Sequence, residues 1–260
     1  MPRISVKTAG PLRAGELPEG FSGEAASAVY FKASDQLQLH SVDLEAGRTI
    51  QVEAGAIDRL IYVWQGSMEV GGCRLAMGSS MIAERSARVQ LTGGKGGAVL
   101  LVFASNIPTQ HPHPGGNVHL LPAERAPRTD SLGGSLELGG VMHADADCPT
   151  CTLWLHENHF PSRNTPPGDK AGIHSHSEDE IIFVTRGEIR LGQRLYGPGT
   201  ALAVAADTLY SFTAGPHGLH FVNFRAKMPG DIYFPDGRLV SETQYWREHL
   251  PRPNYLRCAG

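Results

Sequence analysis

The chain has 260 residues, enough for two domains of about 100–150 residues or for one large barrel. Its 31 glycines and 18 prolines, with only 19% charged residues, indicate many short elements joined by tight turns and favour β structure over long helices. A net charge of −3 gives no field that would attract nucleic acid or an anionic membrane surface, so neither is expected as a partner.

Location and redox state follow from what the sequence lacks. It has no run of about 18 apolar residues that could cross a bilayer, and the start MPRISVKTAG lacks the apolar core of a secretion signal. We therefore expect a cytoplasmic protein. The four cysteines are too few and too unevenly spread for a disulfide framework, so we expect them to be reduced.

The two halves of the chain repeat one pattern of glycines and apolar runs. At a spacing of 121 positions the glycines pair as Gly47 with Gly168, Gly66 with Gly187 and Gly78 with Gly199. The same spacing pairs the apolar segments 98–103 and 219–224, and a spacing of 116 aligns Leu39 with Leu155. Short apolar runs such as 60–64 and 181–184 predict strands. The halves are therefore expected to share one fold.

A segment rich in proline, glycine and serine separates the halves, which places a domain boundary near residue 125. We expect an N-terminal domain over 1–125 and a C-terminal domain over 126–260. His111 and His113 lie in this segment, but the prolines beside them favour an irregular, extended chain. We interpret them as part of an exposed linker.

Cys148 and Cys151 form a C-x-x-C pair early in the second half. The strand-to-helix setting of a redox motif does not surround it, and no second pair completes a zinc site in the sequence. We interpret the two residues as structural thiols beside a turn.

A motif in the second half carries the chemistry. From Gly168 to Gly187 the sequence has the spacing G-x5-H-x-H-x3-E-x6-G, which supplies His174, His176 and Glu180. This spacing resembles the first cupin motif over its whole length. Side chains two apart on a strand share a face, so both imidazoles can reach one ion, and Glu180 can approach it from the next strand. Two imidazoles and one carboxylate suit Fe, Mn, Ni, Co or Zn and leave coordination positions open.

The second cupin motif is preserved only at its leading glycine, Gly199, and Tyr210 stands where the family's fourth ligand is normally a histidine. Tyr210 can serve as a phenolate ligand, can hydrogen-bond a metal-bound water or substrate, or can be a structural aromatic. We expect it to face the pocket. His217 and His220 could replace the missing ligand, but we expect them in a loop or on a strand exterior.

The equivalent positions of the N-terminal half have lost the ligands. Glu53 stands in place of His174, Gly55 in place of His176, Arg59 in place of Glu180 and Val89 in place of Tyr210. A cation at Arg59 would oppose a metal, so we expect a metal-free barrel that serves as scaffold. A less favoured alternative is a separate anion or ligand site formed by Arg59 and Glu53.

One helix is predicted near the C-terminus. Ser241 and Gln244 form a capping box ahead of residues 245–250, and Pro251 ends the helix. We expect it to pack on the outside of a barrel.

The resemblance implies an all-β fold of two antiparallel, jelly-roll-like cupin barrels followed by this short helix, often assembled as a homodimer or larger homo-oligomer. It implies one divalent transition metal in the C-terminal domain, with His174, His176, Glu180 and Tyr210 as candidate ligands and Glu180 and Tyr210 as candidate catalytic groups. The first functional hypothesis is a dioxygenase-type oxidoreductase acting on a small, anionic or oxygenated acid or enol chelated to the metal. Alternatives are a non-redox lyase, isomerase or hydrolase, and a binding protein without turnover.

Overall fold

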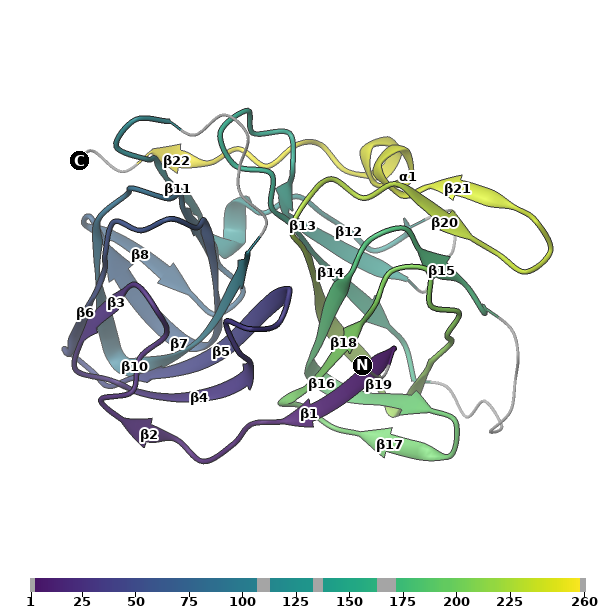
Figure 1. Ribbon diagram of the computed structural model, residues 1–260, viewed down its shortest axis with the longest axis horizontal. Coiled ribbons are helices and arrows are strands. Elements are labelled where there is room, and N and C mark those ends of the chain that lie inside the picture. The colour runs from purple at the N-terminus through teal and green to yellow at the C-terminus, as the bar shows by residue number, and fades with distance from the viewer. Residues whose placement is uncertain (1–2, 107–112, 133–137, 163–171, 258–260) are drawn as a thin grey trace. The chain divides into compact units, whose positions relative to one another are not determined.

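The computed structural model describes residues 3–106, 113–132, 138–162 and 172–257 (Figure 1). Gly168, His111 and Cys258 lie outside the described residues. The chain forms two compact units. Unit 1 comprises Met1–Thr8, Pro127–Ala146 and Trp154–Arg252, and unit 2 comprises Ala9–Ala126, Asp147–Leu153 and Pro253–Gly260.

Unit 2 is built around an antiparallel 11-stranded sheet whose main path is β2-β4-β5-β10-β7-β9-β11-β22, with β3, β6 and β8 paired off this path. Its elements are β2 (Arg13–Ala14), β3 (Phe21–Gly23), β4 (Ala26–Phe31), β5 (Leu37–Leu44), β6 (Thr49–Val52), β7 (Arg59–Val70), β8 (Cys73–Ala76), β9 (Ser80–Ala83), β10 (Val89–Ser105), β11 (Val118–Leu121), the 3-10 turn η1 (Ala123–Arg125) and β22 (Leu256–Arg257).

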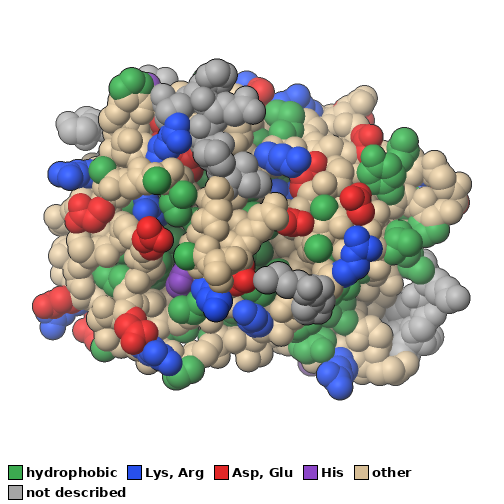
Figure 2. Space-filling view, in the orientation of Figure 1, with side chains coloured by type: hydrophobic (Ala, Val, Ile, Leu, Met, Phe, Trp, Pro, Cys, Tyr) green, Lys and Arg blue, Asp and Glu red, His purple; other side chains and the backbone are tan. Residues whose placement is uncertain are grey.

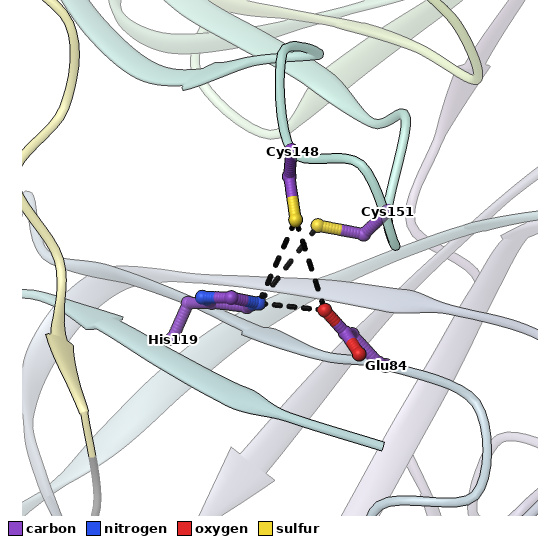
Figure 3. A group of neighbouring side chains, drawn as sticks. All are labelled: Glu84, His119, Cys148 and Cys151. Carbon is purple, nitrogen blue, oxygen red and sulfur yellow. Dashed lines mark hydrogen bonds and ion pairs between the residues drawn. The ribbon is translucent and has the colours of Figure 1, made fainter. Parts of the chain in front are cut away.

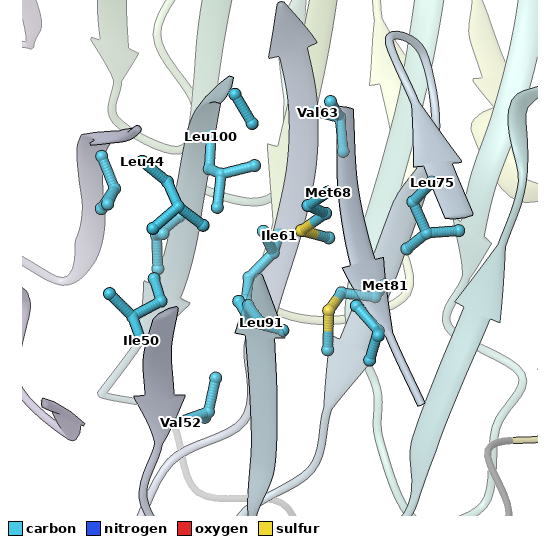
Figure 4. Close-up of a cluster of buried hydrophobic side chains, with 14 of the residues drawn as sticks. Leu44, Ile50, Val52, Ile61, Val63, Met68, Leu75, Met81, Leu91 and Leu100 are labelled. Atoms are coloured by element: carbon cyan, nitrogen blue, oxygen red, sulfur yellow. The ribbon is translucent and has the colours of Figure 1, made fainter. Parts of the chain in front are cut away.

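The interior of unit 2 is filled by aliphatic side chains and methionines (Figure 4). Alternate residues of a strand point to the same face, so the apolar positions of β5, β7 and β10 converge on one core. Leu44, Ile61, Met68 and Leu100 are each completely buried there. These side chains fill the interior of unit 2.

Unit 1 holds an 8-stranded antiparallel sheet, whose main path is β1-β18-β16-β19-β14-β13-β12 with β17 paired to β16, and a 3-stranded sheet, β15-β20-β21. Its elements are β1 (Ile4–Thr8), β12 (Arg128–Thr129), β13 (Gly139–Asp145), β14 (Trp154–Phe160), β15 (Ser175–His176), β16 (Glu180–Leu191), β17 (Arg194–Tyr196), β18 (Thr200–Val204), β19 (Thr213–Arg225), β20 (Asp231–Tyr233), β21 (Leu239–Ser241) and α1 (Glu242–His249).

The N-terminal strand belongs to unit 1, because β1 pairs antiparallel with β18 from Ile4 opposite Val204 to Thr8 opposite Thr200. Ile4 and Val6 pack against the apolar core of this unit, which includes Ile182. The pairing covers the edge of the sheet at β18, an arrangement that protects unpaired strand edges from other chains.

The repeat seen in the sequence is confirmed by strand register. In unit 2, Leu39 of β5 lies opposite Phe103 of β10, and in unit 1, Leu155 of β14 lies opposite Phe224 of β19. The long strands β7 and β16 pair with β10 and β19 in the same antiparallel way. The two units therefore use the same hairpins at the same sequence spacing.

Gly66 and Gly187 occupy equivalent irregularities in β7 and β16. Their φ angles are +71° and +68°, a region that residues with a Cβ rarely adopt. A Cβ at Gly187 would lie 2.2 Å from the carbonyl oxygen of Gly218, and one at Gly66 would lie 2.1 Å from that of Gly97. Only glycine lets the neighbouring strand approach so closely.

We expect Gly187→Ala to lower the free energy of unfolding by at least about 2 kcal/mol, from backbone strain together with steric overlap. Gly197→Ala is the matched control, because no atom lies within 4 Å of its Cβ position. Urea unfolding of both variants measures the difference. Equal stabilities would contradict the close approach of β16 and β19.

The N-cap half of the predicted capping box is present: Ser241 is the N-cap of α1 and its Oγ accepts a hydrogen bond from the backbone N–H of Gln244. The side-chain amide of Gln244 donates to Glu248 at 2.8 Å. Helix α1 ends at His249, shortly before Pro251. Among the described residues, no helix is both long and apolar enough to span a membrane. On the face drawn in Figure 2, acidic and basic side chains are interspersed, as a small net charge predicts.

Candidate functional site

Unit 1 contains a cavity of ≈150 Å³ to which β14, β15, β16, β19, β20 and α1 contribute side chains. A water molecule occupies about 30 Å³ in the liquid, so this space suits a molecule of a few heavy atoms. His174, His176 and Tyr210 all line the cavity. Glu180 is 1% exposed and lies against these cavity residues. The structure thus brings together all four residues that the motif singled out.

Local pairing fixes the two histidines and the tyrosine beside one another. His174 and Tyr210 form an isolated antiparallel bridge, in which each backbone N–H donates to the other residue's carbonyl oxygen at 3.0–3.1 Å. His176 follows in β15, which pairs with β20. The ring centroids lie 4.9 Å apart for His174 and His176, and 4.8 Å apart for His174 and Tyr210.

The two imidazoles differ in what surrounds Nδ1. The Nδ1 of His174 lies 2.6 Å from the carbonyl oxygen of Gly172, an acceptor, so a proton on Nδ1 leaves Nε2 with its lone pair, as in metal-ligating histidines. The Nδ1 of His176 lies 2.9 Å from a carboxylate oxygen of Glu242 and 3.1 Å from Nη2 of Arg225, which is a donor. The position of the proton on His176 is therefore not fixed by Glu242 alone.

The carboxylate of Glu180 is saturated with donors. The Tyr210 hydroxyl donates to its Oε1, while the side-chain amide of Asn223 (2.7 Å) and the guanidinium of Arg225 (2.9 Å) donate to its Oε2. Burial opposes the ionisation of Glu180, but His176 and Arg225 outweigh it and lower its pKa to about 2. Glu180 is therefore ionised at neutral pH.

Arg225 joins Glu180 to a second buried carboxylate, Glu242, the first residue of α1. The guanidinium is completely buried, and Glu242 is 3% exposed. Burial opposes the charge on each, yet the mutual attraction raises the pKa of Arg225 and lowers that of Glu242. Two carboxylates against one guanidinium leave an excess negative charge, which a proton on His176 or a bound cation would neutralise.

A divalent metal fits this site in part. Nε2 of His176 lies 4.0 Å from Oε2 of Glu180, a gap compatible with an ion bound to both at about 2.0–2.2 Å each. The free imidazole nitrogens and the excess negative charge favour such an ion. Arg225 opposes it, because its guanidinium contacts the same carboxylate oxygen. Glu180 would therefore be a weaker metal ligand than the motif alone implies.

The cavity also contains polar atoms without partners in the described residues. The side-chain carbonyl oxygens of Asn158 and Asn223 are buried and accept no hydrogen bond, and the Nε of Arg225 donates none. Each unpartnered buried group costs about 1–3 kcal/mol. A ligand with hydroxyl groups and a carboxylate could satisfy these groups.

His217 and His220 do not line the cavity, as expected. His217 is exposed and its Nδ1 contacts Glu188 at 2.6 Å. His220 stacks on His159 with a centroid separation of 4.2 Å.

In unit 2 the position equivalent to Glu180 is filled by Arg59, which is 2% exposed. Its guanidinium donates to the backbone carbonyls of Glu19, at 3.2 and 3.3 Å, and of Ile57, at 3.4 Å. A Cβ at Gly55, the counterpart of His176, would lie 2.9 Å from an Arg59 nitrogen. Glu53 instead accepts from the Ser22 hydroxyl at 2.7 Å. Arg59 and Glu53 therefore have separate partners.

Sequence reasoning missed Arg225 and Glu242. Glu242 lies within the capping box, and Arg225 follows the apolar run 219–224, but neither pattern indicates that the two side chains meet Glu180. The sequence did not indicate that α1 contributes Glu242 and Trp246 to the lining of the cavity. Sequence reasoning also missed that Glu84 and His119 adjoin Cys148 and Cys151.

His156 gives the site a pH dependence. Its ring is 3% exposed, packs 4.3 Å from Trp246 and accepts a hydrogen bond from the Trp154 indole at 2.8 Å. Burial lowers the pKa of His156 from 6.5 to about 3. Below pH 6.5 the unfolded chain takes up a proton that the folded protein resists, so the stability falls with pH between about 6.5 and 3.

From pH 7.5 to 5.5 this histidine should remove about 1 kcal/mol of stability. The unfolding free energy of the wild type should therefore fall between these pH values by about 1 kcal/mol more than that of His156→Gln. His217→Gln, at an exposed position, should leave the decrease unchanged. Urea titrations at the two pH values test this; identical decreases in all three proteins would contradict it.

No protein-family model and no curated protein matches the chain. Solved structures do match. One is a candidate dioxygenase from Nostoc punctiforme, with 11% identity, coverage of 88% of this chain and 84% of that chain, and a TM-score of 0.64. The YlbA protein of E. coli has 14% identity, coverage of 85% and 90%, and a TM-score of 0.60.

A deletion mutant of Bacillus subtilis oxalate decarboxylase has 12% identity, coverage of 93% of this chain and 80% of that chain, and a TM-score of 0.61. At these identities the likeness shows the fold alone. The chain is an all-β protein with the cupin fold, formed by two antiparallel jelly-roll barrels and a short C-terminal helix.

Proposed function

We propose that this protein is a metal-dependent enzyme that acts on a small oxygenated organic acid bound in the cavity of unit 1. The observation that carries the proposal is the placement of two imidazoles, His174 and His176, beside the buried carboxylate of Glu180 at one cavity. The name of one structural neighbour, an oxalate decarboxylase, supports chemistry on a small acid, and that of another, a candidate dioxygenase, supports an enzyme that uses O₂.

His174, His176 and Glu180 would hold the ion, with Fe, Mn, Ni, Co and Zn all compatible with the donor set. Bound there, it would polarise substrate oxygens and, if it were Fe, bring O₂ chemistry to the site. The protein's own groups would position the substrate. The unpartnered oxygens of Asn158 and Asn223 would accept hydrogen bonds from substrate hydroxyls.

Tyr210 would donate a proton to the substrate. Its hydroxyl donates to the ionised Glu180, and burial together with that charge raises its pKa well above 10, so it carries its proton at neutral pH. A substrate oxygen that developed negative charge could receive this proton. The cavity of ≈150 Å³ restricts the substrate to a few heavy atoms.

A second candidate is a non-redox enzyme, a lyase, isomerase or hydrolase. The hydrogen bond from the Tyr210 hydroxyl to the Glu180 carboxylate favours this candidate, because an acid beside a base is sufficient for a reaction that needs only proton transfer and no oxidant. Oxygen consumption separates the two candidates.

The test uses wild type and a His174→Ala, His176→Ala double variant, with a His217→Ala, His220→Ala variant as the matched control. Small hydroxy acids, keto acids and enols are screened for product formation and oxygen uptake. Wild type and control should turn over the same substrate, and the double variant should lose both the activity and the metal bound in unit 1. Full turnover by the double variant would exclude the proposal.

A further inference from the structure

Four side chains of unit 2 with metal-binding atoms converge on one point (Figure 3). Glu84 directly follows β9, His119 lies in the neighbouring strand β11, and Cys148 and Cys151 come from the segment Asp147–Leu153. One ligand atom from each lies within 4.8 Å of all the others. Antiparallel pairing of β9 with β11 sets Glu84 beside His119. The backbones of Cys148 and Cys151 form an isolated antiparallel β-bridge that closes the C-x-x-C turn, and both thiols are free.

The separations resemble the edges of a zinc tetrahedron. Cys148 Sγ lies 3.8 Å from Glu84 Oε1 and 3.9 Å from His119 Nε2, and Cys151 Sγ also lies 3.9 Å from His119 Nε2. Bonds of about 2.3 Å to sulfur and about 2.0–2.2 Å to nitrogen and oxygen give tetrahedral edges of about 3.3–3.8 Å. Only the contact between His119 and Glu84, at 2.7 Å, is clearly shorter.

Hydrogen bonds alone account poorly for this convergence. His119 Nε2 faces a carboxylate oxygen and two sulfurs, yet an imidazole nitrogen offers one proton or one lone pair. A cation can satisfy all the facing groups at once, because thiolates, carboxylates and a neutral imidazole are all electron-pair donors.

Surrounding groups orient the ligands as in built metal sites. The second oxygen of Glu84 accepts hydrogen bonds from the backbone and side-chain nitrogens of Asn117, at 2.9 and 3.0 Å. Thr150 donates to Oε1 of Glu84 at 2.6 Å, and the His119 ring packs 5.3 Å from the ring of Tyr255. Glu84 and Cys151 are each 1% exposed.

We propose that unit 2 binds one zinc ion through Glu84, His119, Cys148 and Cys151. Two thiolates, an imidazole and a carboxylate form a donor set that selects zinc over the hard cations. Four protein ligands close the coordination shell, so the ion has a structural role and fastens the segment Asp147–Leu153 to β9 and β11. The site is separate from the cavity of unit 1 and independent of the proposed enzymatic function.

A second cavity gives access to this site. It measures ≈790 Å³, and its lining includes His119, Cys148 and Thr150. A chelator can therefore approach the ion from the side of Cys148, and the two cysteines should become reactive once the metal is removed.

Zinc content of the purified full-length protein is the first test. All variants are made in the His174→Ala, His176→Ala background, which removes the proposed unit 1 metal; this background and its Cys73→Ser variant should each hold one zinc, and its Cys148→Ser, Cys151→Ser variant should hold none. Cys73 is the matched control, because it lies in β8 of the same unit and outside the cluster. Zinc retained by the Cys148, Cys151 variant, or a disulfide between these residues in freshly purified wild type, would overturn the proposal.

Cobalt substitution of wild type provides a test that depends on no variant. Co²⁺ in this site should show thiolate-to-cobalt charge-transfer absorption and the intense visible bands of tetrahedral coordination. The thiol count should rise by two when a chelator is added. A spectrum without a thiolate contribution would overturn the assignment, whatever metal unit 1 holds.

Discussion

Arg225→Met is expected to lower the free energy of unfolding by about 3–5 kcal/mol, the largest single effect on stability that we predict. The guanidinium is completely buried and contacts Glu180 and Glu242, both also buried. Methionine fills similar space but leaves both carboxylates without their cation. Removal of one partner from a buried ion pair costs more than the pair itself contributes, because the remaining charge stays desolvated.

Urea unfolding at pH 7.5 measures this loss, and Arg238→Met is its control. Arg238 pairs with Asp236 at the surface, with both side chains more than half exposed, so its replacement should leave the unfolding curve unchanged. Adding Glu242→Gln to Arg225→Met should restore part of the stability, because one of the two orphaned charges is then removed. If the double variant instead loses as much stability as the two single variants together, Arg225 and Glu242 do not interact.

Tyr210→Phe is expected to decrease turnover by about 10²-fold or more on the substrate found by screening, since it removes the proposed proton donor. Folding should be retained, because the ring volume is kept and the change should cost less than about 1.5 kcal/mol. The Tyr210 hydroxyl contacts Glu180, so Glu180→Gln should also decrease turnover. Steady-state kinetics at matched metal occupancy are the measurement.

Tyr245→Phe is the control for this prediction. Tyr245 also lines the cavity, but it contacts Trp246 and His249 through its ring. Its turnover should stay close to that of the wild type. A Tyr210→Phe enzyme as active as Tyr245→Phe would return Tyr210 to a structural role in the barrel wall.

Local patterns in the sequence determined much of the architecture. The spacing of 121 positions predicted the duplicated hairpins, because two chains that fold alike must place turn glycines and apolar strands at equal intervals. The capping box at Ser241 predicted the start of α1, since a cap depends on neighbours three residues apart. The H-x-H spacing brought His174 and His176 to one cavity, because it sets two side chains on one face.

Contacts between distant segments were decided only by the tertiary structure. The sequence gives no sign that β1 pairs with β18, or that Arg225 and Glu242 enclose the charge of Glu180. Nor does it indicate that Glu84 and His119 adjoin the C-x-x-C pair, because they lie 64 and 29 residues from Cys148 along the chain. The spacing of a motif predicts which side chains share one strand or one turn. Which charged and metal-binding side chains come into contact depends on how separate strands pack against one another, and that is not contained in any local spacing.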